Sequence, residues 1–377
     1  MTKKKANGEG TIYWNKLKQR WIGQLSYEGR RVDVRGKSQQ EVVQKIEERK
    51  QQLRIGIDVS GTLTLGSYLE EFLVLEENAL AYVTWKGYCS LAENHLIPRL
   101  GRHRLNKLTP MHITTTWNKM MSDGVGVSTI QHCQSFLSHA INQAIGRSLM
   151  VQNPCNFATI PKLPHREITI IDENDVALFL NHTEVSDIDY HPFYHAAFQT
   201  GMRRGELAAL QWRDVDLLGM QLQVNRSYGI VKNGYGYKTP KSGKGRSVDL
   251  TVGANLFLKD LKDQQLEMFT VNKDSHVFRY MHGTHPKRIV GNNITPDAAT
   301  DSFKKSAVQI GMNNIHLHNA RHSHAGLLLK MGTHPKVVQE RLGHSSIQVT
   351  MDIYSHIAPN LQRDAIKDFP LFVESRL

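Results

Sequence analysis

Two breaks in the residue pattern divide the chain into three parts of different character. The first is the glycine-bounded stretch 56–61, and the second is the proline-rich stretch 153–164. Clusters of glycine and proline mark turns and linkers rather than the interior of a helix or strand. The chain has 377 residues, more than a single hydrophobic core usually serves. We therefore expect a multidomain protein, with domains at 1–58, 62–155 and 166–377 and a tail at the carboxy-terminal end.

The first part combines basic and aromatic residues. Residues 1–40 hold ten Lys or Arg residues against three acidic ones, and they supply over half of the chain's net charge of +12. Disordered basic tails lack aromatic residues, whereas Tyr13, Trp14, Trp21 and Tyr27 alternate here with charged residues. The period-two alternation over 11–35 predicts three short strands. The first part is therefore expected to fold.

A helix should follow these strands. Ser38 and Glu41 have the spacing of a capping box, which predicts a helix from this point to about Arg54. Its apolar stripe is expected to consist of Val42, Val43, Ile46 and Leu53.

The charge of this part favours a polyanionic partner. A small sheet fits the major groove of DNA, where basic side chains reach phosphates and base edges. The sequence therefore predicts a DNA-binding domain. Its contacting residues are expected to be Lys16, Lys18, Arg20, Arg30, Arg31 and Arg35. The alternative, a β-module that docks on another protein, fits the charge less well.

The second part has helical periodicity up to about Met150. Four helices are expected, at Leu65–Glu77, Val83–Leu96, Pro110–Ser122 and Ser128–Ser148. Pro110 suits a first helical turn, and Asp123-Gly124 should end the third helix. The core of this helical domain is expected to contain Met111, Trp117, Met120, Met121, Phe136, Leu137 and Ile141.

Composition excludes two other classes of protein. No apolar stretch approaches the ~18 residues of a membrane-spanning helix, and no apolar segment follows the basic residues at the amino terminus, so a secretory signal is not expected. We expect a cytoplasmic protein. Cys89, Cys133 and Cys155 are odd in number and far apart, which favours buried thiols over a disulfide framework or a metal site.

Five short segments of the third part carry candidate chemistry. Each alone is weak, because arginines after glycine, Gly-Lys turns and single tyrosines are common in any protein. Their order and spacing carry the argument. The segments are Thr200–Leu207 (TGMRRGEL), Lys241–Arg246 (KSGKGR), His318–His322 (HNARH), Leu342–His344 (LGH) and Tyr354.

These residue types suit phosphoryl transfer without a metal. Attack on a DNA phosphate creates a doubly negative centre that needs pre-positioned donors. No carboxylate cluster accompanies the basic residues, so organic cations would have to supply the charge. The forked guanidiniums of Arg203 and Arg321 match two phosphate oxygens. His318 and His344 add donors or move protons.

The five segments resemble the motifs of the tyrosine recombinases, also called phage integrases. That family has an arginine in a TGxRxGEL helix start, a lysine on a β-hairpin, a His-x-x-Arg helix, a Leu-Gly-His turn and a tyrosine about ten residues later. The resemblance implies six catalytic residues, namely Arg203, Lys241, His318, Arg321, His344 and Tyr354. It also implies a mixed α+β, mainly helical, catalytic domain behind an arm-binding sheet and a helical core-binding domain.

The implied reaction is a strand transfer through a covalent intermediate. Tyr354 would attack phosphorus to give a 3′-phosphotyrosine, and the hairpin lysine would protonate the departing 5′-hydroxyl. Lys241, five residues before Arg246, has the best register, and Lys238 and Lys244 remain alternatives. Because the ester retains the bond energy, strands can be rejoined through a Holliday junction without ATP.

The chain departs from the family at two of the motifs. Asn319-Ala320 stands inside the His-x-x-Arg motif where Asp-Leu is usual, so altered contacts around the site are expected. After the hairpin the chain has Val248-Asp249-Leu250 where a proline is common, and Gly243 and Gly245 predict a mobile loop. Glu206 is expected to position backbone or arginine rather than to act in catalysis.

The resemblance implies partners as well as chemistry. These are double-stranded DNA with core-type and arm-type sites, a homotetramer on DNA, an excisionase and a DNA-bending host protein; no membrane, metal or other cofactor is implied. A helix from Pro359 to about Lys367 and the apolar end 369–373 would form a tail that packs on its own domain or on a neighbouring subunit.

Three other interpretations compete with the recombinase. His318 and His322 stand four apart, as zinc ligands on a helix do, but no Glu lies between them in the H-E-x-x-H sense and no cysteine is near. A type IB topoisomerase shares the chemistry but needs no second DNA-binding module. A non-catalytic DNA-binding protein would not need the intact residue set.

Overall fold

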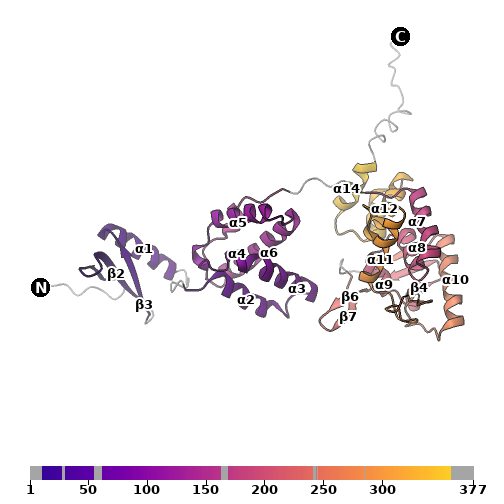
Figure 1. Ribbon diagram of the computed structural model, residues 1–377, viewed down its shortest axis with the longest axis horizontal. Helices are drawn as coiled ribbons and strands as arrows, with labels where there is room; N and C mark the ends of the chain where they lie inside the picture. The colour runs from indigo at the N-terminus through magenta and orange to yellow at the C-terminus, as the bar shows by residue number, and fades with distance from the viewer. Residues whose placement is uncertain are drawn as a thin grey trace, which may run out of the picture. The chain divides into compact units, whose positions relative to one another are not determined.

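The computed structural model describes residues 11–27, 30–54, 62–162, 169–240, 243, 245–283 and 285–357. It divides the chain into two compact units, Met1–Pro164 and His165–Leu377, so their boundary meets the end of the predicted second linker. The predicted first linker falls entirely on residues outside these ranges, and the three-domain division stays a prediction. Figure 1 shows the elements in chain order.

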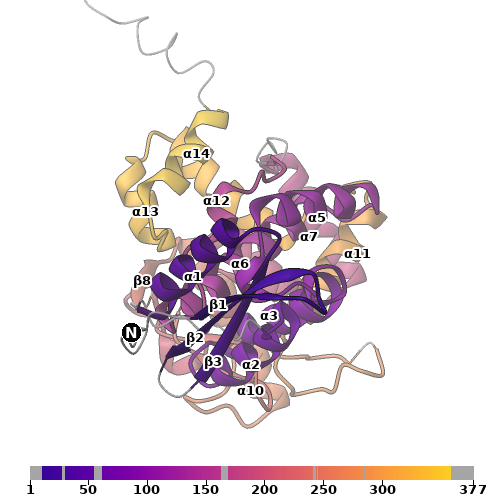
Figure 2. The ribbon, with the colours of Figure 1, turned by 90° about the vertical axis from the view of Figure 1, so that its left-hand side faces the viewer.

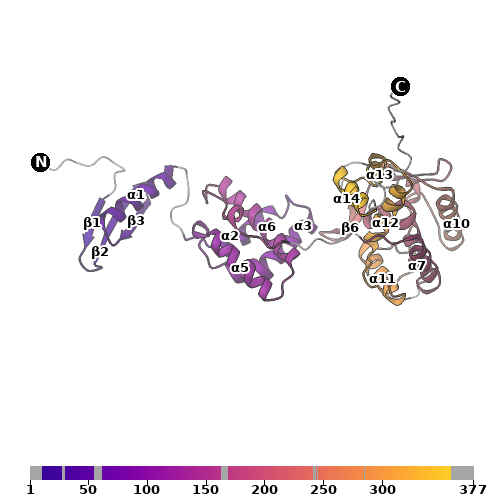
Figure 3. The same ribbon diagram turned by 90° about the horizontal axis from the view of Figure 1, so that it is seen from above.

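A three-stranded antiparallel sheet with one helix opens the chain, as the sequence predicts. Its strands have the order β1-β2-β3. The elements are β1 Thr11–Asn15, β2 Arg20–Tyr27, β3 Arg30–Gly36 and α1 Gln39–Arg54. Figure 3 shows α1 beside the sheet. The contact centres on Gly23, where an added Cβ would lie 2.6 Å from side-chain atoms of both Val42 and Ile46. Sheet and helix meet closely because this position has no side chain.

The start of α1 confirms part of the predicted cap. The Ser38 hydroxyl accepts from the Glu41 backbone N–H at 3.1 Å, but the Glu41 carboxylate accepts from the Lys37 N–H at 2.7 Å rather than from Ser38. Val42 and Ile46 are buried, whereas Val43 is 50% exposed and does not belong to the stripe. One residue turns a helix by ~100°, which moves Val43 off the packed face. The Leu53 side chain lies outside the described residues.

The rest of the first unit is a helical bundle close to the predicted one. Its helices are α2 Leu65–Glu76, α3 Tyr82–Leu91, α4 Ile97–Leu100, α5 Pro110–Ser122 and α6 Val127–Gly146. A π-helical turn at Ala92–Leu96 joins α3 to α4, so the predicted second helix is longer than expected. A 3₁₀ turn at Leu105–Lys107 precedes α5. Pro110 opens α5 and Asp123 caps its end, as predicted.

The bundle core confirms most of the expected residues and corrects three points. Trp117, Met120, Phe136, Leu137 and Ile141 are fully buried. Met111 and Met121 are 71% and 45% exposed, so their assignment to the core is wrong. The predicted second linker also begins too early. Its residues 154–157 form a 3₁₀ turn, and the backbone carbonyl of buried Cys155 accepts a 2.8 Å hydrogen bond from Gln134.

The second unit is mainly helical with two small sheets, in agreement with the expected fold class. Its helices are α7 Glu173–Ser186, α8 His191–Thr200, α9 Arg204–Ala209, α10 Val252–Met268, α11 Pro296–Gln309, α12 Leu317–Lys330, α13 Pro335–Leu342 and α14 Ile347–Ile357. A 3₁₀ turn at Trp212–Asp214 precedes the first strand. Its strands are β4 Val215–Asp216, β5 Gln221–Val224, β6 Ser227–Val231, β7 Gly234–Lys238 and β8 Arg246–Asp249.

The strands of this unit are not paired as the lysine motif suggests. β8 pairs with β5, and β7 pairs with β6. β7 and β8 therefore belong to two different sheets and do not form a hairpin with each other. The register of β8 is fixed by its pairing with β5, not by β7.

Two clusters of apolar side chains hold the second unit together. The larger one surrounds α8, where Phe193 and Tyr194 are fully buried. The smaller one joins α12, α13 and α14 through Ala325, Leu329, Val338, Leu342 and Ile353. Figure 2 shows α13 and α14 next to each other at the carboxy-terminal end of the described chain. This small cluster places the last three predicted motifs on one set of helices.

Three further predictions concern residues outside these cores. Cys133 and Cys155 are buried free thiols as predicted, whereas Cys89 is half-buried. Within the described ranges, no helix is long and apolar enough to cross a bilayer. The predicted helix from Pro359 and the apolar end 369–373 lie outside the described residues.

Candidate active site

The turn between α8 and α9 fixes the first motif. Gly201 caps the carboxy-terminal end of α8, and its φ of 62° lies in the left-handed region. A Cβ added there would lie 2.5 Å from the Leu342 side chain and 2.8 Å from that of His324, so both the backbone angle and the packing require glycine. Arg203 follows as the N-cap residue of α9. The motif therefore holds Arg203 at a rigid turn beside α12 and α13.

Arg321 lies on α12, as the His-x-x-Arg spacing predicts, and is only 3% exposed. Its Nη1 donates to the Gly201 carbonyl at 2.8 Å, and its Nη2 donates to the Leu342 carbonyl at 2.7 Å. Burial and the neighbouring charge of Arg203 lower the pKa of Arg321 to about 9, which leaves it charged at neutral pH. A guanidinium has more N–H groups than these two bonds use, so Arg321 retains donors for an anion.

Three consecutive carbonyls at the end of α13 anchor three arginines. The donors are Arg246 Nε to Arg341 at 2.8 Å, Arg321 Nη2 to Leu342 at 2.7 Å, and Arg203 Nη2 to Gly343 at 2.7 Å. The last carbonyls of a helix have no partner within it and carry the negative end of its dipole. α13 therefore offsets part of the repulsion between three like charges.

Glu206 supplies the negative side chain of this arrangement. Its carboxylate is 1% exposed and accepts from Arg203 Nη1 at 2.9 Å and from Arg246 Nη1 and Nη2 at 3.1 and 2.7 Å. It also accepts from the Arg203 backbone N–H at 3.0 Å. Burial alone would raise the pKa of Glu206, but the bonds and charges of Arg246 and Arg203 outweigh it and lower that pKa. Glu206 thus orients the arginines, as the sequence analysis expected.

Arg246 is a site residue that the sequence reasoning missed. In the sequence, Arg246 indicated only the register of Lys241. In the structure its side chain is 10% exposed and joins β8 to both Glu206 and the end of α13. The signal in the sequence was the arginine that begins the strand after a Gly-Lys loop. Only the packing of β8 on α13 shows what it contacts.

His318 lies one turn before Arg321 on α12. Partial desolvation by neighbouring atoms and the nearby charges of His322 and Arg321 lower the pKa of His318, although this residue is exposed. The rings of His318 and His322 meet edge to face at 4.6 Å. Beside them lies a pocket of about 480 Å³, whose lining includes Arg203, His318 and Arg321. Three of the six predicted residues therefore meet around one hollow. Within the described residues, no group of three or more His, Cys, Asp or Glu side chains is placed to hold a metal ion.

Asn319, one departure from the family motif, has a structural role of its own. Its Oδ1 accepts from the His316 N–H at 2.7 Å, and its Nδ2 donates to the Thr169 carbonyl at 2.8 Å. The side chain thus caps the start of α12 and ties it to the segment that enters the unit. Both of these contacts are with backbone atoms, and whether they differ from those of the family stays a prediction.

His344 lies between α13 and α14, and Tyr354 lies in the second half of α14. The ring of His344 contacts Thr350 through a 2.9 Å hydrogen bond between Nδ1 and Oγ1. Burial and the charges of Arg321 and Arg203 lower the pKa of His344 to about 3. Tyr354 is half-buried and packs against the small cluster that contains Leu342. Within the described residues, no hydrogen bond joins its hydroxyl to the arginines.

The lysine assignment is not tested, because Lys241 and Lys244 lie outside the described residues. Lys238 is described as the last residue of β7. A Cβ added at Gly229 would lie 3.2 Å from its Nζ, so the side chain crosses a face of the hairpin that glycine leaves open. Burial lowers the pKa of Lys238.

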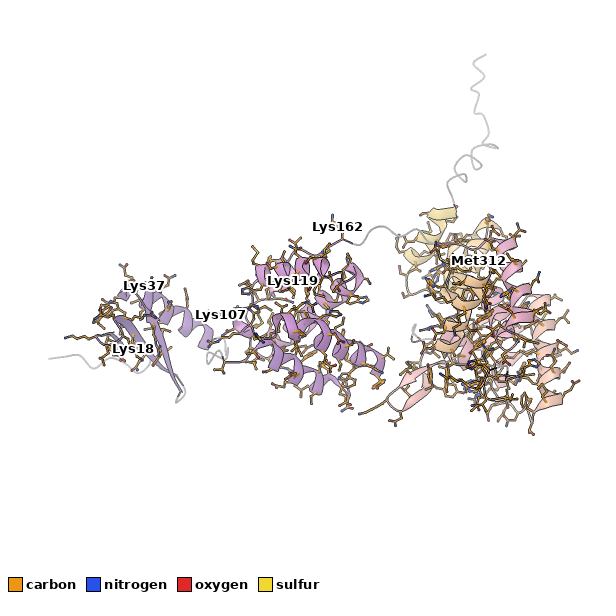
Figure 4. All side chains as sticks on the ribbon, in the orientation of Figure 1. Lys18, Lys37, Lys107, Lys119, Lys162 and Met312 are labelled. Carbon is orange, nitrogen blue, oxygen red and sulfur yellow. The ribbon has the colours of Figure 1, made fainter. Side chains whose placement is uncertain are left out.

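The predicted DNA-binding residues belong to the β1–β2 turn and to strands β2 and β3 of the first sheet. Lys16 and Lys18 lie in the exposed β1–β2 turn, and Figure 4 shows Lys18 there. Arg20 and Arg35 are exposed, and Arg35 pairs with Ile22 on the sheet face opposite Gly23. The side chains of Arg30 and Arg31 lie outside the described residues. The structure thus leaves four of these six basic side chains accessible.

Comparisons with known proteins agree with this geometry. Residues 169–360 match the model of the phage integrase family, and residues 64–121 match that of the N-terminal SAM-like domain of phage integrases. The ICEBs1 integrase of Bacillus subtilis strain 168 is 26% identical over 280 residues, which are 73% of this chain and 74% of that protein.

Two solved structures show the same fold. The integrase of the Tn1549 transposon, in complex with a circular intermediate DNA, superposes with a TM-score of 0.69 at 17% identity, over 81% of this chain and 99% of that chain. A lambda integrase tetramer bound to a Holliday junction has a TM-score of 0.59 at 16% identity, over 93% of this chain and 96% of that chain.

Proposed function

The chain belongs to the phage integrase family, and from this premise we propose how its residues recombine DNA. As a tyrosine recombinase it is an enzyme that exchanges DNA strands at specific sites. We infer that it integrates and excises a mobile element by cutting and rejoining strands in pairs. Each cut would proceed through a 3′-phosphotyrosine, and the exchange through a Holliday junction.

The observation that carries this proposal is the anchored arginine pair. Carbonyls at the end of α13 fix both Arg203 and Arg321, and Glu206 also holds Arg203; both arginines line the pocket beside His318. Donors held in place before the reaction stabilise a developing phosphorane charge without reorganising, and loss of one such donor costs about 3–4 kcal/mol. The pocket is therefore suited to bind the scissile phosphate.

The proposed step forms one bond to phosphorus, breaks another and transfers two protons. The Tyr354 oxygen forms a bond to phosphorus while the bond from phosphorus to the 5′-oxygen breaks. The phenol proton of Tyr354 has to pass to an acceptor at the site as the bond forms. The 5′-oxygen receives a proton from Lys241, with Lys238 and Lys244 as the alternative donors. His318 and His344 would hydrogen-bond the non-bridging oxygens.

The other parts would bring DNA to this site. We propose that the sheet at 1–58 binds arm-type sequences through Lys16, Lys18, Arg20, Arg30, Arg31 and Arg35, and that the helical part at 62–155 binds core-type sequences beside the catalytic domain at 166–377. We further propose that four copies assemble on DNA, with the tail past Tyr354 linking subunits. The lambda integrase tetramer supports this by analogy. Direction would depend on an excisionase and a DNA-bending host protein in the bacterial cytoplasm or nucleoid.

Two alternatives differ in what they require. A type IB topoisomerase would relax supercoils with the same chemistry, and the second DNA-binding module is what argues against it. A non-catalytic protein would not need Arg203, Arg321 and Glu206 in a buried network, because burying charges is costly unless they are paired. The network therefore favours an active enzyme.

A suicide substrate tests the proposal. A duplex nicked next to the cleavage site loses a short fragment after attack, which traps the covalent adduct. Wild type should form an adduct that Tyr354→Phe does not form, while both bind DNA equally. Tyr82→Phe, in the helical part of the first unit, is the matched control and should react like wild type. An adduct that persists in Tyr354→Phe would overturn the assignment of the nucleophile.

A further inference from the structure

Thr350 is a buried polar residue that the proposed chemistry leaves without a role. It is 0% exposed and lies on α14 one turn before Tyr354. Its Oγ1 lies 2.9 Å from Nδ1 of His344. Residues four apart on a helix share a face, so Thr350 connects the His344 ring to the helix face that carries Tyr354.

The backbone of His344 is fixed separately. Its N–H donates to the Gln339 carbonyl at 3.1 Å, and its carbonyl accepts from Gln339 Nε2 at 3.3 Å. α13 therefore holds the main chain of His344, while the bond between the His344 ring and Thr350 limits rotation of that ring. The two contacts act on different parts of the same residue.

The protonation state of His344 determines what this bond has to do. Burial and the nearby arginines favour the neutral ring, as the lowered pKa of His344 shows. A neutral imidazole has one N–H and one acceptor nitrogen. If Nε2 is to donate to a phosphate oxygen, Nδ1 has to accept. The partner of Nδ1 therefore has to be a donor, and a threonine hydroxyl is able to donate.

We propose that Thr350 is a positioning residue whose hydroxyl donates a hydrogen bond to Nδ1 of His344. This bond keeps the ring proton on Nε2, facing the phosphate. The same bond sets the distance between His344 and the helix turn of Tyr354. This inference rests on the proposed function of the site. It assigns to Thr350 no contact with DNA.

Rate measurements on four variants test the role. Thr350→Val removes the donor and keeps the branched shape, and Thr350→Ser keeps the donor. Loss of one hydrogen bond of this kind should slow single-turnover cleavage on the suicide substrate about tenfold in Thr350→Val. DNA affinity should stay unchanged, and Thr350→Ser should restore most of the rate. In a His344→Ala background, Thr350→Val should have no further effect, because the residues act through one bond. A further tenfold loss in that background would overturn the proposal.

A spectroscopic measurement keeps the test independent of folding and of turnover. Nitrogen NMR distinguishes the two neutral tautomers of histidine, and comparison with His344→Ala assigns the signal. Wild type should show His344 protonated on Nε2, and Thr350→Val or Thr350→Ala should shift it toward a mixture. A wild-type ring protonated on Nδ1 would refute the inference. If wild type formed no Tyr354-dependent adduct, the proposed function would fail instead, while the tautomer result would still stand.

Discussion

Neutralising Glu206 should destabilise the second unit strongly, because its carboxylate is enclosed by two cations. In Glu206→Gln the shape is retained, but one carboxylate oxygen becomes an NH₂ group. Each oxygen accepts two bonds, Oε1 from Arg203 Nη1 and Arg246 Nη1, and Oε2 from Arg246 Nη2 and the Arg203 N–H. The new NH₂ group would therefore face two donors in either orientation. At least two charged hydrogen bonds are lost.

The expected size follows from these contacts. Hydrogen bonds to charged groups contribute about 1.5–3 kcal/mol each. Removing one partner from a buried ion pair costs roughly 3–5 kcal/mol, because the other charges stay buried without compensation. Both lines of reasoning give a loss of several kcal/mol in the free energy of unfolding. Displacement of Arg203 should also slow DNA cleavage, by up to about 100-fold if the shift approaches ~1 Å.

The matched control is Glu340→Gln on α13. Glu340 is 67% exposed and pairs with Lys336 at 3.4 Å, so this change should cost no more than about 1 kcal/mol. Hydrogen exchange of peptides from α8 and α12, followed by mass spectrometry, reports the stability of the unit within the full chain. Equal protection in Glu206→Gln and Glu340→Gln would refute the claim that the buried carboxylate holds the arginines together.

Three further predictions concern pH, the β6–β7 hairpin and salt. Burial lowers the pKa values of His195 and His324 to about 4 and that of His344 to about 3. Histidines of the unfolded chain titrate at about 6.5. Between these lowered values and about 6.5, the unfolded chain therefore binds more protons than the folded chain. Stability should therefore fall as pH is lowered from 7 to 5, by at most about 2 kcal/mol per histidine, and a melting temperature that holds or rises at pH 5 would contradict this. The Asp297 carboxylate accepts from the Tyr235 hydroxyl at 2.7 Å and pairs with Arg204 at 2.9 Å, so Asp297→Asn should increase hydrogen exchange in β6 and β7 more than in α12, and uniform exchange would argue against a local clamp. Arg20→Ala and Arg35→Ala should each reduce the slope of log affinity against log salt by about 0.9 on arm-type DNA, and an unchanged slope would mean that the residue meets no phosphate.

Local patterns were enough to predict the strands and several helices of the first unit. Period-two alternation, the Ser38 cap and Pro110 act on neighbouring residues, so the strands, α1 and α5 follow from short stretches of sequence. The same patterns misplaced Met111 and Met121, which have helical spacing yet are exposed. Spacing identifies a face but not what covers it.

The candidate site divides in the same way. The order of the motifs predicted Arg203, His318 and Arg321, and the structure brings these together around one pocket. It does not test Lys241, and within the described residues it gives no hydrogen bond between Tyr354 and the arginines.

The sequence by itself determined which residue types are present and on which local elements they lie. Tertiary structure decided how their charges are held: Arg203 meets the Gly343 carbonyl 140 residues away, and Arg246 meets that of Arg341 across 95 residues. Such contacts depend on how α9, α12, α13 and β8 pack, and no short-range rule encodes that packing. For the same reason the bond between Thr350 and His344 became visible only in the folded chain, because it depends on a side-chain orientation that the turn before α14 imposes.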